Sequence, residues 1–354
     1  MGVAGAPEGW RAGMRLLHYE PAVPNFGDDL NPLLWPELAP GLFGQDVSLP
    51  GTGTGNGTAF VGIGTIIGID PAGCSRLHVF TSGAGYSDPA RWQGLDVRYH
   101  CVRGPVSARA LGLPADRALT DGAVLVPRSP SFADLASRPS TTRTVVMPHY
   151  ETLAFPGWSR AAQLAGFDIV DPRGSPRDVI AALAGARLVL TESLHGAILA
   201  DAFGVPWRGF AVSRNFSTAK WADWAASLDM DVTVALVPPP DPMPLLRFGK
   251  RPEPFGTMIA LDPEAALAEF RARIAAPPKV ALVRRQAKRV LEAVPVTRRL
   301  LGFSPERTAQ ALVELATRDP FVSNPSRRAG LADEMLERLY RLAKEAGASA
   351  AVLA

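Results

Sequence analysis

The chain has little of what several classes of protein depend on. Only two of its 354 residues are cysteines, Cys74 and Cys101, which is too few for a disulfide framework and fits a reducing compartment. Its five histidines stand singly, without a His-x-x-x-His pair, so a zinc centre built on closely spaced ligands is not indicated. We expect no bound metal.

Charge of one sign and long apolar runs are also scarce. Lysine and arginine outnumber aspartate and glutamate by only 37 to 34, a balance that does not indicate nucleic-acid binding. The longest uncharged run, residues 47–69, is rich in Gly and Thr and would make a poor membrane-spanning helix. The N-terminal residues lack the apolar core of a signal peptide. We expect a cytoplasmic protein.

Motifs for common cofactors and nucleophiles are missing. Gly62-x-Gly64 has no third glycine at the spacing of a dinucleotide-binding loop, and no Gly-Lys-Ser/Thr is present. The Gly-x-Ser-x-Gly turn of serine hydrolases is absent as well. We interpret Gly64 as part of a tight turn that lets the backbone approach a ligand at the end of a strand. No cofactor is expected.

The chain does have two series of short apolar strands alternating with helical patterns. At 354 residues and 47% hydrophobic content it is long enough for two cores. A Ser-, Pro- and Arg-rich stretch at 128–143 separates the two series, which predicts an α/β protein of two Rossmann-like domains facing each other across a cleft. We place these domains at 14–130 and 143–232, and a helical C-terminal extension at 256–348.

Hydrophobic periodicity and flanking turn residues predict the individual elements. Strands are expected at 14–19, 59–63, 77–81, 97–102, 123–126, 144–147, 168–170, 186–190 and 210–212. Helices are expected at 30–38, 106–111, 161–165, 177–184, 197–203, 218–228, 262–275, 280–294, 304–317 and 330–346. Residues 238–254 are proline-rich and expected to be irregular.

The candidate site lies where strands end and helices begin. His195 follows the strand at 186–190 and precedes an apolar helix. In open α/β sheets, ligands bind outside the carboxyl ends of strands, near helix N-termini. From position alone, His195 is equally suited to acid–base catalysis and to a loop-supporting hydrogen bond.

Two further loops carry charge at equivalent positions. Asp28 and Asp29 precede the helix at 30–38, where they could cap the helix or face the cleft. Arg103 precedes the helix at 106–111, where a cation and free N–H groups favour an anion, although pairing with a neighbouring acid is a common alternative. With His149, Arg214 and Lys220 from the second series, this set suits an anionic substrate.

A basic cluster lies in the helical third of the chain, at residues 284–299 beside an apolar stripe. Such a pattern can contact a membrane surface, which would place the protein at the inner face of the membrane. A solvated cationic face on a packed helix is the favoured interpretation.

Several motifs, taken together in their order, resemble the polysaccharide pyruvyl transferase family, and most closely its exopolysaccharide branch, which builds pyruvate ketals on succinoglycan- or xanthan-type sugars. The resemblance covers about residues 14–228. The motifs are Asn25-Phe26-Gly27-Asp28-Asp29-Leu30-Asn31, Val102-Arg103-Gly104-Pro105-Val106-Ser107, Thr120-Asp121-Gly122-Ala123, Glu192-Ser193-Leu194-His195-Gly196 and Lys220-Trp221-x-x-Trp224.

The resemblance implies a GT-B-like fold and transfer of pyruvate from phosphoenolpyruvate, as co-substrate, to two hydroxyls of a sugar in an exopolysaccharide or its lipid-linked precursor. It implies that Arg103 binds the anionic groups of the donor and that His195 is the general acid or base. Some members carry Arg where this chain has Ser193, and Arg214 or Lys220 could supply that charge. His149 is a further substrate-binding candidate, and Asp28 and Asp29 could bind sugar hydroxyls or act as the base.

Two other functions fit the same pattern. A two-domain cleft would equally serve a GT-B glycosyltransferase with a nucleotide-sugar donor. A non-catalytic glycan-binding protein at a membrane assembly would bind glycan without releasing phosphate. The sugar, the hydroxyl pair and the oligomeric state are not specified by the sequence.

Overall fold

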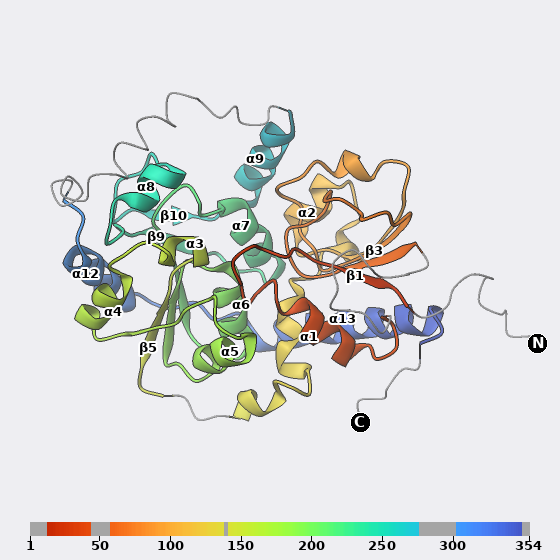
Figure 1. The fold of residues 1–354 in the computed structure, drawn as a ribbon, viewed down its shortest axis with the longest axis horizontal. Helices are drawn as coiled ribbons and strands as arrows, with labels where there is room; N and C mark the ends of the chain where they lie inside the picture. The colour runs from red at the N-terminus through yellow and green to blue at the C-terminus, as the bar shows by residue number, and fades with distance from the viewer. Residues whose placement is uncertain (1–12, 44–56, 138–140, 276–301, 349–354) are drawn as a thin grey trace, which may run out of the picture.

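The computed structural model describes residues 13–43, 57–137, 141–275 and 302–348 of the chain. Within these residues the protein contains two β-sheets, one of four strands and one of six, each covered by helices. Figure 1 shows the first sheet and its helices on the right and the second sheet with its helices on the left. The fold is therefore of the α/β class, as the sequence predicts.

The first sheet is formed by four strands in sequential order, with every neighbouring pair parallel. These strands are β1 (Arg15–Leu17), β2 (Thr58–Val61), β3 (Arg76–Phe80) and β4 (Asp96–Cys101). Alternate side chains enter two different hydrophobic clusters, so that Val61 and Val79 pack on one face while Phe60 and Phe80 pack on the other. Burial on both faces explains why β2 is buried at every position, whereas the edge strand β4 carries charged and exposed residues.

Short helices connect and cover this sheet. They are α1 (Asn31–Leu38), α2 (Pro105–Ala110) and the 3-10 helices η1 (Pro89–Trp92), η2 (Ala115–Arg117) and η3 (Gly122–Arg128). The 3-10 helix η4 (Ala133–Ser137) follows η3 and packs against α5 (Pro176–Ala184) of the second half. Trp35 of α1 packs edge-on against Phe60 and Phe80, at ring-centroid distances of 5.1 and 5.5 Å. This contact fixes α1, and with it the loop that precedes α1, against the end of the sheet.

The second sheet has the strand order β10-β9-β8-β7-β5-β6. Its strands are β5 (Thr144–Met147), β6 (Asp168–Ile169), β7 (Leu188–Thr191), β8 (Trp207–Ala211), β9 (Thr233–Leu236) and β10 (Met258–Ala260). All neighbours are parallel except the antiparallel edge strand β10. If β5 is counted as strand 1 and the sheet is read from β6 to β9, the strand order is 2-1-3-4-5, which is that of a doubly wound sheet. The switch point of such a sheet lies between β5 and β7.

Helices cover both faces of the second sheet. They are α3 (Tyr150–Leu153), α4 (Trp158–Ala165), α5 (Pro176–Ala184), α6 (Leu194–Ala202), α7 (Thr218–Ser227), α8 (Met243–Phe248) and α12 (Pro305–Ala316). The helix α9 (Pro263–Ala275) packs on α7 and on α2 of the first half. Val146 and Leu190 share a core with α4 and α12, whereas Val145 and Val189 face α5 and α6. The latter core continues through η3 into the first sheet, so the two halves pack on each other.

The last helix, α13 (Pro325–Glu345), returns to the first sheet. Met335 and Leu339 enter the core that contains Phe60, and Arg338 donates to the His100 carbonyl of β4 at 2.7 Å. Figure 1 shows α12 beside α4 on the left and α13 near β1 and α1 on the right. The C-terminal third therefore braces both halves.

Three local predictions are wrong. Residues 123–126 form part of the 3-10 helix η3 and not a strand, because a short buried apolar run fits either element and Pro127 cannot donate to a sheet. Neither Asp28 nor Asp29 caps α1, whose N-cap is Leu30 without a side-chain hydrogen bond. The proline-rich stretch at 238–254 contains α8, since Pro244 is tolerated in the first helical turn.

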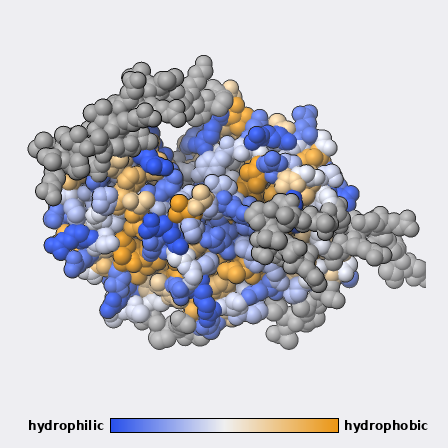
Figure 2. Space-filling model, viewed as in Figure 1, coloured by the Kyte–Doolittle hydropathy of each residue, from blue (hydrophilic) through white to orange (hydrophobic). Residues whose placement is uncertain are grey.

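Two strands beyond residue 232 were not predicted, and part of the predicted C-terminal extension lies outside the described residues. Strands β9 and β10 extend the second sheet beyond residue 232, so 256–348 is not wholly helical. The predicted helix at 280–294 and the basic cluster at 284–299 lie outside the described residues. Among the described helices, none is long and apolar enough to cross a bilayer, and Figure 2 shows hydrophilic and hydrophobic residues intermixed on the face in view.

Candidate active site

A cavity of about 540 Å³ lies at the carboxyl ends of the strands of both sheets. Its lining includes seven residues predicted from the sequence, namely Asp28, Gly64, Arg103, His149, Ser193, His195 and Lys220. The second-sheet residues follow β5 and β7, the two strands that flank the switch point. The cavity is therefore where a ligand of such a sheet is expected.

Arg103 is the most deeply buried cation of the cavity, with 1% of its surface exposed. Its Nε donates to Asp223 Oδ2 at 3.1 Å, and its Nη1 donates to Thr65 Oγ1 at 2.7 Å. Its Nη2 is buried and has no hydrogen-bond partner among the described residues. A guanidinium fixed on two sides and unsatisfied on the third is suited to an anionic ligand oxygen.

Asp223 of α7 connects the two halves at this arginine. It accepts hydrogen bonds from Arg103 Nε and, at 3.0 and 2.5 Å, from the backbone N and Oγ of Ser107 in the first turn of α2. Gly104 makes the approach possible, because a Cβ at that position would lie 2.0 Å from the Asp223 carbonyl. Arg103 therefore pairs with an acid, as one of the two alternatives predicted, and it also lines the cavity. Binding of an anion by Arg103 stays a prediction.

His195 lies in the first turn of α6, and its imidazole contacts the loop that precedes α1. A Cβ on Gly27 would lie 1.8 Å from His195 Nδ1, so only glycine fits there without displacing the ring. Phe26 packs edge-on against the same ring, at a centroid distance of 6.5 Å. Burial lowers the pKa of His195 to about 4, although the charge of Asp28 opposes this shift. The free protein therefore holds this histidine neutral at pH 7.

Asp28 is the carboxyl nearest to this histidine among the predicted residues that line the cavity. It accepts from Asn25 Nδ2 at 2.6 Å, a bond that holds its side chain in the loop and away from the end of α1. Burial raises its pKa above the usual value, while His195, Asn25 and Lys220 oppose the shift. A carboxyl with a raised pKa beside an imidazole with a lowered pKa is a pair across which a proton can move.

His149 and Glu192 form a second hydrogen-bonded group at the ends of β5 and β7. Glu192 is buried, and its two oxygens accept the backbone N–H groups of His149 at 3.0 Å and Val212 at 3.3 Å. Asn215 Nδ2 lies 3.1 Å from His149 Nδ1. Burial lowers the pKa of His149 to about 3 and raises that of Glu192 to about 7, so Glu192 titrates near neutrality.

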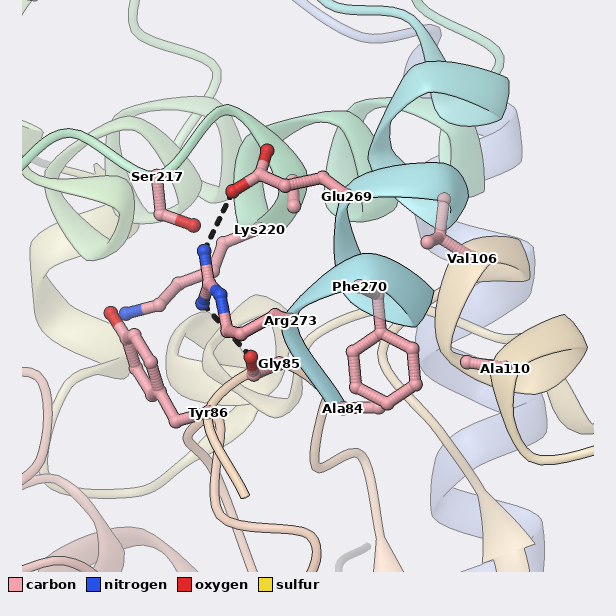
Figure 3. A pocket seen from close by; sticks show the side chains of 11 residues that line it. Ala84, Gly85, Tyr86, Val106, Ala110, Ser217, Lys220, Glu269, Phe270 and Arg273 are labelled. Atoms are coloured by element: carbon pink, nitrogen blue, oxygen red, sulfur yellow. Dashed lines mark hydrogen bonds and ion pairs between the residues drawn. The ribbon is translucent and has the colours of Figure 1, made fainter. Parts of the chain in front are cut away.

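Ser193, Gly64 and Lys220 complete the predicted lining. Ser193 is the N-cap of α6, where its Oγ accepts from Gly196 N at 3.4 Å. Gly64 adopts a φ of +133°, a backbone conformation that L side chains rarely adopt. Lys220 places its Nζ 4.2 Å from the centre of the Tyr86 ring (Figure 3). Lys220 thus brings a cation to the cavity, and Ser193 contributes a hydroxyl.

Two predicted residues lie elsewhere. Asp29 does not line the cavity, and its charged neighbours are His18 and Glu20. Arg214 is exposed, its backbone N donates to the Gly249 carbonyl at 3.0 Å, and its side chain packs on that glycine. Of the two candidates for the charge that other members carry at the position of Ser193, Lys220 therefore lines the cavity and Arg214 does not.

Several lining or supporting residues were missed by the sequence reasoning. Asp223 lies inside the Lys220-Trp221-x-x-Trp224 motif, where a carboxylate among tryptophans signals a buried partner. Glu192 directly follows β7, closer to the strand end than His195. Thr65 and the tyrosines at positions 19, 86 and 150 carry no comparable signal, because only the fold shows that they share one cavity.

The site lies at the strand ends of an α/β fold, and comparison with known proteins specifies the class of the protein. The sequence model of the family described as polysaccharide pyruvyl transferase matches residues 97–214. The chain belongs to this family and is a transferase of polysaccharide pyruvylation.

One relative places the chain within the family. It is similar to the succinoglycan biosynthesis protein ExoV of Rhizobium meliloti (strain 1021), with 36% identity over 233 residues, which span 64% of this chain and 68% of the relative. This identity supports the succinoglycan-type branch. No solved structure matches the chain.

Proposed function

We propose that the protein transfers pyruvate from phosphoenolpyruvate to two hydroxyls of a sugar in an exopolysaccharide or its lipid-linked precursor, forming a cyclic ketal. The single observation that carries the donor assignment is that Arg103 lines the cavity while its buried Nη2 has no hydrogen-bond partner among the described residues. A buried guanidinium nitrogen that lacks an acceptor favours a ligand with anionic oxygens. Phosphoenolpyruvate has both a phosphate and a carboxylate.

In this proposal the two sheets and their helices act as two Rossmann-like domains in a GT-B-like arrangement. Arg103 follows the last strand of the first sheet, whereas His195 follows a central strand of the second. The cavity volume of about 540 Å³ lies within the roughly 300–1,000 Å³ typical of ligand sites. It has room for a three-carbon donor beside one sugar ring, which a direct transfer requires.

The chemistry needs one proton donor and two proton acceptors. A proton added to the methylene carbon of phosphoenolpyruvate makes the neighbouring carbon electrophilic, and one sugar hydroxyl adds there and loses its proton. The bond from that carbon to the phosphate oxygen then breaks, the second hydroxyl closes the ketal, and its proton is taken up by the departing phosphate. The products are the ketal carboxylate and inorganic phosphate, so atoms and charge balance.

We assign the proton donor to His195 and the first acceptor to Asp28 or to the histidine after its proton has left. The lowered pKa of His195 describes the free site, and a bound polyanion favours the protonated imidazole. Arg103 would stabilise the phosphate as negative charge develops on it, with Lys220 as a second cation at the same cavity. No metal or nucleotide takes part in these steps, and we place the enzyme in the cytoplasm.

Ligand-dependent melting tests the donor directly. Phosphoenolpyruvate at a concentration well above its dissociation constant should raise the melting temperature, whereas nucleoside diphosphates should not. Arg103→Met should lose this stabilisation. Stabilisation by nucleoside diphosphates alone would instead support a glycosyltransferase that uses a nucleotide-sugar.

Turnover tests the transfer. With phosphoenolpyruvate and a suitable hexoside, the protein should release phosphate and form an acid-labile product, and His195→Ala should abolish both while its melting temperature stays close to that of the wild type. Undiminished turnover in this variant would remove His195 from the mechanism.

A further inference from the structure

Three tyrosines of the chain gather around the cavity. The sequence contains five tyrosines, and Tyr19, Tyr86 and Tyr150 all line this one site. Tyr19 and Tyr86 leave 50% and 57% of their surface exposed. Packing in a hydrophobic core therefore does not explain why large aromatic residues stand at these two positions. Large aromatic side chains with this much exposure at a cavity mark a surface that a ligand can cover.

The three side chains come from separate loops and converge. Tyr19 follows β1, Tyr86 follows β3, and Tyr150 begins α3 after β5. Burial is the main cause that raises the pKa of the Tyr150 hydroxyl to about 12, and the nearby charges of Glu151, Tyr19, Asp28 and Tyr86 raise it further. Tyr150 therefore lies within electrostatic range of the other two tyrosines and of the carboxyl proposed to take part in proton transfer.

Tyr86 is held in place by cations from the other half of the protein. Lys220 Nζ lies 4.2 Å and Arg273 Cζ 5.9 Å from the centre of its ring. Arg273 of α9 also donates to the Gly85 carbonyl at 3.0 Å and pairs with Glu269 at 2.6 Å (Figure 3). The ring is thus fixed before any ligand arrives, which lowers the entropic cost of binding.

The chemistry of these rings fits a sugar. A hexose presents C–H bonds on its faces and hydroxyls at its edge, and a tyrosine offers an apolar face and a polar tip. Polar groups that could meet hydroxyls stand close by, since Asn215 donates to Glu151 Oε2 at 3.0 Å and both residues line the cavity. Arg103 and His195 are less exposed than the two outer tyrosines and form the inner part of the site.

We propose that Tyr19 and Tyr86 form the acceptor subsite, where their rings stack on the terminal hexose while the Tyr150 hydroxyl binds one of the two reacting sugar hydroxyls. This inference rests on the proposed function for the identity of the reaction, but not for the binding of the sugar. It assigns the inner part of the cavity to the enol phosphate and the outer part to the glycan.

Steady-state kinetics with phosphoenolpyruvate and methyl glycosides of the common hexoses test the assignment. Tyr19→Ala and Tyr86→Ala should each raise KM for the hexoside roughly tenfold, which corresponds to the loss of one good aromatic contact. The KM for phosphoenolpyruvate should stay within about twofold of the wild-type value. Tyr86→Phe, which keeps the ring, should restore hexoside binding.

Tyr340→Ala is the matched control, because Tyr340 lies on α13 and does not line the cavity. It should leave both KM values unchanged. An unchanged hexoside KM in both cavity variants, or an equal rise in the KM of both substrates, would overturn the subsite.

Binding without phosphoenolpyruvate separates this inference from the proposed function. In saturation-transfer NMR, ring protons of a methyl hexoside should receive signal from the wild type and Tyr340→Ala but not from Tyr86→Ala. This result would support the acceptor subsite even if no phosphate were released from phosphoenolpyruvate. The missing release of phosphate would refute only the proposed reaction. Equal transfer from all three proteins, or no transfer from the wild type, would refute the subsite itself.

Discussion

Removing the Asp223 carboxylate should both weaken the fold and release the arginine that faces the cavity. Asp223→Ala takes away the acceptor of three buried hydrogen bonds, from Arg103 Nε and from the N and Oγ of Ser107. The two charged side chains are 1% and 2% exposed. Breaking a buried ion pair by deleting one partner costs about 3–5 kcal/mol, because the other charge is left unpaired.

A double-mutant cycle separates the pair from its surroundings. Arg103→Met leaves Asp223 with its two bonds to Ser107, so its cost should be smaller than that of Asp223→Ala. The double variant should unfold with a cost at least about 2 kcal/mol below the sum of the two single changes, because it removes both partners of the ion pair. Equilibrium urea unfolding followed by tryptophan fluorescence is the assay, because Trp221 and Trp224 lie on either side of Asp223 in the sequence.

The matched control is the ion pair between Arg109 of α2 and Glu264 of α9, which also connects elements of the two halves. Its side chains are 47% and 70% exposed, so solvent screens the interaction. Glu264→Ala should leave the urea midpoint close to that of the wild type. If Asp223→Ala shifted the midpoint no more than this control, the reasoning about the buried pair would be refuted.

Three further predictions concern the titrating groups and their packing. Burial raises the pKa of the Glu192 carboxyl to about 7 from 4.5, so the folded state binds this proton more tightly than the unfolded state does. Relative to Glu192→Gln, the wild type should lose about 3 kcal/mol of unfolding free energy between pH 4.5 and pH 7 and no more above pH 7. A difference in unfolding free energy that does not change with pH would contradict this prediction. Burial lowers the pKa of His195 to about 4; in NMR titrations it should rise when phosphoenolpyruvate binds, and an unchanged value would argue against an anion beside the ring. Gly27→Ala places a Cβ within 1.8 Å of His195 Nδ1 and should reduce kcat at least tenfold, whereas Gly330→Ala, where nothing lies within 4 Å, should not; equal activity of the two variants would show that the ring position is unimportant.

The parallel core of the fold could be predicted from the sequence. Strands β5, β7 and β8 are short apolar runs followed by helical patterns, and runs buried on both faces carry a strong hydrophobic signal. The run at 123–126 was equally apolar yet forms a 3-10 helix, because burial alone does not specify the backbone conformation. Strand β10 is partly exposed and only three residues long, which leaves little periodicity to detect.

The candidate site was predictable where it follows strand ends. His149, His195 and Arg103 directly follow β5, β7 and β4 or lie one short loop beyond them, and all three line the cavity. Residues held there by tertiary packing carried no local signal, because Tyr86 lies in a loop whose position depends on Arg273 of α9 and Lys220 of α7. Arg214 is the opposite case, because it lies three residues after the end of β8 and yet does not line the cavity.

One measurement tests the central claim most directly, namely parallel ³¹P and ¹H NMR of the wild type with phosphoenolpyruvate and a methyl hexoside. We predict that the phosphoenolpyruvate signal is replaced by inorganic phosphate while a new methyl singlet of a ketal appears in equal amount, and that neither change occurs with His195→Ala. Phosphate released without the ketal signal, or a mixture unchanged across the full set of hexosides that bind, would contradict the account.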